Sequence, residues 1–168
     1  MGIVFVVLAS WGYGSGLIRQ VRLHRDNLFA CRELLDLLLG EIKYGKTPLG
    51  EAFLVIAQRL KEPFRSTLTQ IAEELSGKQY ESLQEIWNRC FMEKQKELLF
   101  TEEEMSILYG IGKNLGYLDT DMQTRHLTLY QKQVDGFMEQ MEKTVKEKTK
   151  LYRSLSLMVG AMVILLLV

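Results

Sequence analysis

The chain has few of the residues that constrain small folds: its 168 residues include only 2 cysteines, 2 prolines and 2 histidines. Two cysteines cannot supply the several disulfides of a small secreted scaffold. The chain also lacks a net charge, because 21 basic side chains balance 21 acidic ones. Without a basic excess, a broad nucleic-acid-binding surface is disfavoured, and we expect no nucleic-acid partner.

Charge is also absent from both ends of the chain. All charged side chains lie between Arg19 and Arg153, and residues 1–18 and 154–168 carry none. The averages of 47% hydrophobic and 25% charged residues are those of an ordinary soluble globule, and they conceal this distribution. The pattern predicts a charged middle between two apolar ends.

The first apolar segment, residues 1–18, would form a helix of about 27 Å, near the thickness of a bilayer core. We predict a retained transmembrane anchor here, in which Gly12 and Gly16 have the spacing of a helix-packing pair. A cleaved signal peptide and a buried core helix are the alternatives. A signal peptide has basic residues before its apolar run, whereas here Arg19, Arg22 and Arg25 follow it.

The second apolar segment, residues 151–168, predicts a C-terminal transmembrane helix with Ser156 and Gly160 as its small-residue pair. Basic side chains again lie on the inner side of the segment: Lys146, Lys148, Lys150 and Arg153. The positive-inside rule then places the domain of residues 19–150 in the cytoplasm and both segments in the cell membrane. We therefore expect an integral membrane protein.

Between these segments, apolar residues recur at spacings of three and four, and β-branched alternation is almost absent. The pattern predicts an all-α fold with six helices. Thr47 caps a helix that has Pro48 in its first position, and Gly77 ends the helix that begins at Pro63. The expected helices are 24–44, 48 to about 60, 63–77, 80–96, 101–115 and one from about 119. If this last helix continues through 151–168, it is about 48 residues and about 70 Å long.

No set of residues has the spacing that catalysis, cofactor binding or metal binding requires. Gly110, Gly112 and Gly116 resemble a dinucleotide-binding fingerprint, but the third glycine is one position late and no strand precedes it. We interpret them as helix-packing and capping residues. His24 and His126 lack a second ligand one helical turn away, so a zinc site is disfavoured.

Other reactive residues have structural explanations. Cys31 and Cys90 lie in amphipathic helices and are expected to be small core residues. Thr101 followed by Glu102–Glu104 is a capping box with acids in the first helical turn, which accounts for this acidic run without a bound cation. We therefore predict no cofactor and no enzymatic activity.

Two stretches carry a resemblance to a known family, residues 41–49 (EIKYGKTPL) and residues 115–123 (LGYLDTDMQ), and the entry into the last apolar segment, residues 152–155 (YRSL), is similar too. With the order of apolar segment, helical domain and apolar segment, they resemble the stage III sporulation protein AB family of endospore-forming bacteria. The cytoplasmic domain of that family is similar to one domain of the inner-membrane platform proteins of type II secretion and type IV pilus machines. The resemblance therefore implies a six-helix antiparallel bundle.

The resemblance also implies a function. The protein would be a non-enzymatic platform in the secretion-like channel that joins mother cell and forespore, in the mother-cell membrane facing the forespore. Its partners would be a secretion-type ATPase of the stage III sporulation protein AA type and other channel subunits. It would either anchor the ATPase or transmit its conformational work. Secretion platforms carry two such domains and this chain has one, so self-association or other subunits would complete the platform.

Two turns are the candidate sites on this reading, acting either as partner contacts or only as structural turns of the bundle. Their residues are Gly45, Thr47, Pro48, Leu49, Leu115, Gly116, Asp119 and Gln123. Two other hypotheses stay open. A membrane-tethered sensor or adaptor unrelated to secretion fits the same pattern, whereas a membrane-bound enzyme would need paired acids, an activated nucleophile or metal ligands.

Overall fold

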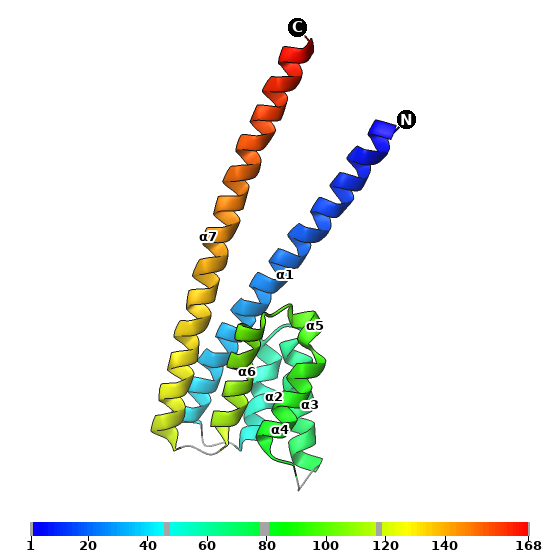
Figure 1. Ribbon diagram of the computed structural model, residues 1–168. Coiled ribbons are helices and arrows are strands. Elements are labelled where there is room, and N and C mark those ends of the chain that lie inside the picture. Colours follow the sequence, from blue (N-terminus) through cyan, green and yellow to red (C-terminus); the bar gives the residue numbers. More distant parts are fainter. Residues whose placement is uncertain (1, 46–47, 78–80, 117–118, 168) are drawn as a thin grey trace. The chain divides into compact units, whose positions relative to one another are not determined.

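The computed structural model describes residues 2–45, 48–77, 81–116 and 119–167, and the side chains of those that lie between 19 and 145. This part of the chain contains helices and no strand, which confirms the predicted all-α class. The helices are α1 (Gly2–Tyr44), α2 (Leu49–Arg59), α3 (Phe64–Gly77), α4 (Leu83–Glu93), α5 (Gln95–Leu98), α6 (Glu102–Leu115) and α7 (Thr120–Leu167) (Figure 1).

The chain divides into two compact units, Met1–Val134 and Asp135–Val168, and the division falls inside α7. In the first unit α1, α2, α3 and α4 run alternately down and up the bundle, and α6 and the first part of α7 continue the alternation (Figure 1). Helix α2 packs against α3, α3 against α4, and α4 against α6. In the second unit the Nζ atom of Lys143 lies 2.8 Å from Oε1 of Glu139, one turn away.

The core of the first unit is built around Trp87 of α4, whose side chain is 0% exposed. Its ring centroid lies 4.8 Å from that of Phe91 and 5.7 Å from that of Phe53. Its indole Nε1 donates a hydrogen bond of 2.7 Å to the carbonyl of Leu108. Trp87 thus ties α4 to α2 by ring contact and to α6 by a buried hydrogen bond. The apolar stripe that the three-and-four spacing predicts for residues 24–44 is buried at Leu28, Leu34, Leu35 and Leu38, whereas its last member, Ile42, is only half-buried.

Several helix ends agree with the sequence interpretation. Thr101 caps α6: its hydroxyl accepts from the amide of Glu104 at 3.3 Å, and the Glu104 carboxylate accepts from the amide of Thr101 at 2.8 Å. Helix α3 ends at Gly77, as predicted. Helix α7 spans 48 residues without interruption, which is the length expected for a last helix that continues through residues 151–168.

Other boundaries differ from the expectation. No helix boundary separates residues 18 and 19, because α1 is continuous from Gly2 to Tyr44. Pro48 occupies the N-cap position of α2 with φ −56° and ψ 144°, so the helix begins one residue later than predicted. The expected helix over 80–96 begins at Leu83, after a second capping box formed by Ser82 and Glu85.

The same predicted helix also ends early, at Glu93, and the short helix α5 follows it. Leu99, which ends α5, adopts the left-handed conformation with φ 59° and ψ 23°. This conformation costs a residue with a Cβ atom free energy and stops the helix. The chain then turns into α6, so the bundle contains one short helix that the apolar spacing did not predict.

The two predicted membrane spans find no support in the helices. Within the described residues, no helix has an apolar stretch of the length and hydropathy needed to cross a membrane. The side chains of residues 1–18 and 151–168 lie outside the described part, including those of Gly12, Gly16, Ser156 and Gly160.

Candidate functional site

The first predicted turn joins α1 to α2. The amide of Gly45 donates to the carbonyl of Glu41 at 2.7 Å, which closes the last turn of α1. A Cβ atom on Gly45 would collide with that same carbonyl, so the close approach requires glycine. Pro48 is exposed and its carbonyl accepts from the amide of Ala52 at 3.0 Å, whereas Leu49 is half-buried. Thr47 lies outside the described residues, so its predicted capping role stays a prediction.

The second predicted turn joins α6 to α7. Leu115 is buried at 2% exposure, and its carbonyl accepts from the side-chain amide of Gln123 at 2.8 Å. The Asp119 carboxylate accepts from the amide of Met122 at 2.9 Å and so caps α7. Gly116 ends α6 with φ −99°, a value open to any residue, and a Cβ atom there would meet only Leu83 at 3.9 Å. Leu115, Asp119 and Gln123 therefore have structural roles, whereas Gly116 has open space around it.

These two turns lie at the same end of the bundle. The last residues of α1 and α6 and the first residues of α2 and α7 meet there, although about seventy positions separate the two turns in the sequence (Figure 1). The end of α3 and the beginning of α4 reach the same end. The bundle thus brings together the two sequence stretches that carry the family resemblance. We call this surface the turn end.

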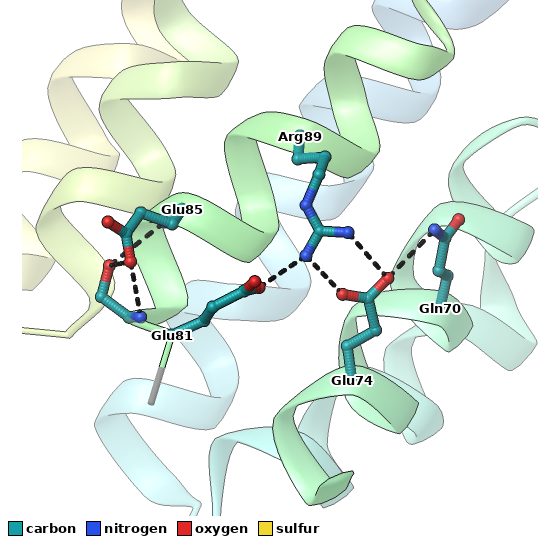
Figure 2. Close-up of polar contacts among 6 residues, drawn as sticks. Gln70, Glu74, Glu81, Glu85 and Arg89 are labelled. Atoms are coloured by element: carbon teal, nitrogen blue, oxygen red, sulfur yellow. Dashed lines mark hydrogen bonds and ion pairs between the residues drawn. The ribbon is translucent and has the colours of Figure 1, made fainter. Parts of the chain in front are cut away.

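An ion-pair network lies between α3 and α4 near the turn end (Figure 2). The Arg89 guanidinium donates to Oε2 of Glu74 at 2.6 Å and to Oε2 of Glu81 at 2.7 Å. Gln70 donates to the other Glu74 oxygen at 3.2 Å. The hydrogen bond to Glu74 is the main cause that raises the pKa of Arg89. One guanidinium serves two carboxylates, so the network connects the ends of α3 and α4 but has no arrangement typical of catalysis.

A second polar cluster lies at the opposite end, where α1 passes α5 and α6. Nε2 of His24 lies 2.8 Å from Oε2 of Glu104, and Glu104 is only 6% exposed. The side-chain amide of Asn27 donates to the carbonyls of Glu97 and Leu98 at 3.0 and 2.9 Å. These contacts give the Glu104 carboxylate a partner on α1 and bond the carbonyls of Glu97 and Leu98, and they hold α1 on the bundle.

Two of the three glycines that resembled a nucleotide fingerprint, Gly110 and Gly112, are packing residues, and Gly116 is the cap of α6, as interpreted from the sequence. A Cβ atom on Gly112 would lie 2.5 Å from Cδ1 of Trp87, and one on Gly110 would collide with the Tyr130 hydroxyl. Tyr130 in turn accepts a hydrogen bond of 2.9 Å from Asn114. The small side chains let α4 and α7 approach α6.

Neither cysteine has the surroundings of a nucleophile. Cys31 and Cys90 form no disulfide and are 1% and 0% exposed, which agrees with their expected core positions. Burial, aided by the nearby Glu104 carboxylate, raises the pKa of Cys31 to about 12. Within the described residues, no group of three or more His, Cys, Asp or Glu side chains is placed to hold a metal ion.

The basic residues next to the apolar segments are described only in part. Arg19 and Arg22 are exposed on α1, and Arg25 pairs with its exposed neighbour Asp26 at 3.2 Å. The side chains of Lys146, Lys148, Lys150 and Arg153 lie outside the described residues.

Comparisons with known proteins agree on one family. The model of the family described as stage III sporulation protein AB matches residues 1–168. A curated protein of that name from Bacillus subtilis (strain 168) is 26% identical over 167 residues, which cover 99% of this chain and 97% of that protein. The solved structure of a stage III sporulation protein AB matches with a TM-score of 0.65 and 25% identity, over 71% of this chain and 94% of the other.

The fold and the site define an all-helical bundle whose two turn motifs meet at one end. With a family model that covers its whole length, the chain belongs to the stage III sporulation protein AB family.

Proposed function

We propose that this protein is a non-enzymatic platform of the secretion-like channel between mother cell and forespore, and that its turn end engages a secretion-type ATPase. The family match over residues 1–168 supports a role in sporulation. One observation carries the finer proposal: the described residues of the two stretches 41–49 and 115–123, which hold most of the family resemblance, lie at the turn end (Figure 1). Pro48, Gly116 and Asp119 are exposed there and accessible to a partner.

A membrane location belongs to the same proposal. Residues 1–18 and 151–168 carry no charge except Arg153, and basic residues border both segments on their inner sides. On this basis the two segments lie in the mother-cell membrane and the bundle lies in the cytoplasm. The platform domains of type II secretion and type IV pilus machines, which the family resemblance implies for this bundle, would have the same arrangement.

The partner experiment uses Gly116→Arg in the full chain. Because Gly116 has open space and an ordinary φ, the variant folds but places a long side chain on the turn end. We expect it to retain much less of the coexpressed ATPase than the wild type does in a pull-down from solubilised membranes. The matched control is Gln95→Arg, on exposed α5 at the opposite end, which retains it fully. If both variants retain the ATPase equally well, the turn end is not the surface that binds it.

Two further measurements test the role and the topology. Deletion of the gene is expected to block spore development after engulfment, and normal sporulation of the deletion strain contradicts the proposal. In intact cells the cysteine of a Gly77→Cys variant is expected to be protected from impermeant thiol reagents, whereas the cysteine of a Leu167→Cys variant is expected to react. The reverse labelling pattern contradicts the orientation.

The second candidate is a membrane-tethered sensor or adaptor unrelated to secretion. It is favoured by the same apolar and basic segments and needs no ATPase. A genomic neighbourhood without a secretion-type ATPase gene would support it over the platform.

A further inference from the structure

The part of α1 that follows the uncharged segment is exposed all round. Each of the five residues from Arg19 to Leu23 is exposed, and the first buried residues of α1 are Asn27 and Leu28. Five consecutive residues point in every direction around a helix, because each is rotated by about 100° from the last. Helices in proteins owe most of their stability to the packing of one apolar face. Residues 19–23 have no such buried face among the described residues.

Three arginines form one stripe along this part of α1. Arg19, Arg22 and Arg25 follow one another at intervals of three residues, so neighbouring members lie on the same side of the helix. The stripe points away from the core, because Arg22 is nine residues, or about two and a half turns, from the buried Cys31. Arg25 pairs with Asp26 at 3.2 Å, whereas Arg19 and Arg22 make no ion pair or hydrogen bond within the described ranges.

Arg19 and Arg22 also lie at the depth of lipid headgroups, and here the inference rests on the proposed membrane location of residues 1–18. A helix rises about 1.5 Å per residue, so Arg19 and Arg22 follow Ile18 by about 2 and 6 Å. The headgroup layer on each side of a bilayer is about 5 to 8 Å deep. Arg25, about 10 Å beyond Ile18, lies outside this layer.

The chemistry of this part of α1 fits phospholipid. The stripe contains arginine and no lysine, and a guanidinium donates two parallel hydrogen bonds to a phosphate, which an ammonium group cannot do. Val21 and Leu23 are each 44% exposed beside the arginines. At the boundary between headgroups and acyl chains, apolar side chains are covered by lipid while the basic ones reach phosphate. One lipid surface therefore satisfies both kinds of side chain.

We propose that Arg19 and Arg22 bind the phosphate groups of anionic phospholipids, which cover residues 19–23 of α1. Two positive charges without a protein partner complement a headgroup that carries a net negative charge. A zwitterionic headgroup brings its own cation and complements them less well. The protein thus gathers anionic lipid where α1 leaves the membrane.

Tryptophan fluorescence of the full chain in vesicles tests the proposal. Trp11 lies within residues 1–18, and the second tryptophan, Trp87, is 0% exposed in the core of the bundle. The vesicles contain equal amounts of phosphatidylglycerol and phosphatidylcholine, and brominated acyl chains, which quench tryptophan on contact, are carried by one lipid or by the other. We expect brominated phosphatidylglycerol to quench more strongly, with an enrichment of this lipid around the segment of about threefold or more.

The variant Arg19→Gln with Arg22→Gln is expected to lower this enrichment about twofold or more. The matched control is Lys43→Gln with Lys113→Gln, which removes the same charge at exposed positions near the turn end and keeps the wild-type enrichment. Circular dichroism confirms that both variants are helical.

The outcomes separate this proposal from the membrane location on which it rests. Equal quenching by the two lipids in the wild type, or unchanged enrichment in the Arg19→Gln, Arg22→Gln variant, overturns the proposal and leaves the membrane location standing. Loss of the enrichment when inorganic phosphate replaces chloride at constant ionic strength also overturns it, because the arginines then take a free anion. If neither brominated lipid quenches the fluorescence, residues 1–18 lie outside the bilayer and the membrane location is wrong as well.

Discussion

Replacing Gly112 by alanine is the sharpest test of how the bundle packs. Gly112 is buried in α6, and a Cβ atom there would lie 2.5 Å from Cδ1 and 2.6 Å from Cγ of Trp87. Trp87 has no room to retreat, because it is 0% exposed and packs on Phe91 and Phe53. Its indole is also held by the hydrogen bond to the Leu108 carbonyl. The added methyl group therefore displaces the ring at the centre of the core.

The magnitude follows from three contributions. Overpacking a tight core costs about 2 kcal/mol, and weakening the buried indole hydrogen bond costs about 1 kcal/mol. Alanine has a higher helix propensity than glycine, and this stabilises the folded variant by about 1 kcal/mol. We expect Gly112→Ala to lower the free energy of unfolding by about 2 kcal/mol.

The assay is urea denaturation of the solubilised full chain, followed by helical circular dichroism. Gly40→Ala is the matched control, because this exposed glycine lies within α1 and a Cβ atom there meets nothing within 4 Å. The control should raise the free energy of unfolding by about 0.5 to 1 kcal/mol. If Gly112→Ala proves as stable as Gly40→Ala, the reasoning from the Trp87 contact is wrong.

Three other predictions follow from local geometry. Leu99→Gly should raise the free energy of unfolding by about 1 kcal/mol in the same assay, because glycine adopts the left-handed φ of 59° without strain; a loss of stability would show that the leucine side chain outweighs the backbone. Cys31 and Cys90 should resist a thiol reagent at neutral pH until denaturant is added, because both are buried; rapid labelling of the native chain contradicts this. Hydrogen bonds from Ser82 lower the pKa of Glu85 in the folded chain below the value of 4.5 expected when it is unfolded. The Ser82–Glu85 capping box therefore stabilises the fold fully above pH 4.5, and this stabilisation is lost as the pH falls through the pKa of Glu85 in the folded chain. Thermal melts of Ser82→Ala should therefore differ from wild type at pH 7 and converge in acid, and a constant difference would contradict this.

The local rules of helix formation were sufficient for most of the fold. The three-and-four spacing of apolar residues predicted most of the buried stripe of α1, and short-range hydrogen bonding predicted the cap at Thr101. The capping box of Ser82 and Glu85 had the same sequence signal, a serine followed three positions later by glutamate, and it was missed. The end of α5 had no such signal, because a leucine, Leu99, rather than a glycine takes the left-handed conformation there.

Sequence reasoning could not find the long-range polar pairs. His24 and Glu104 are 80 positions apart, and Gln131 and Asp36 are 95 positions apart. Their pairing depends on which helices are neighbours and on how each helix is rotated about its axis. The spacing of apolar residues along the sequence predicts neither of these. The candidate turns show the same limit, because the sequence named their residues but did not indicate that the two turns lie at one end.

By itself the sequence determined the all-helical class, most helix ends and the family, because these depend on spacing, capping and short motifs along the chain. Tertiary structure alone decided that Gly112 makes room for Trp87, that the ends of α1 and α6 lie at the same end of the bundle as the beginnings of α2 and α7, and that Gln131 of α7 meets Asp36 of α1. Each of these relations joins helices distant in the sequence, and only the packing of side chains in the core selects which helix faces meet.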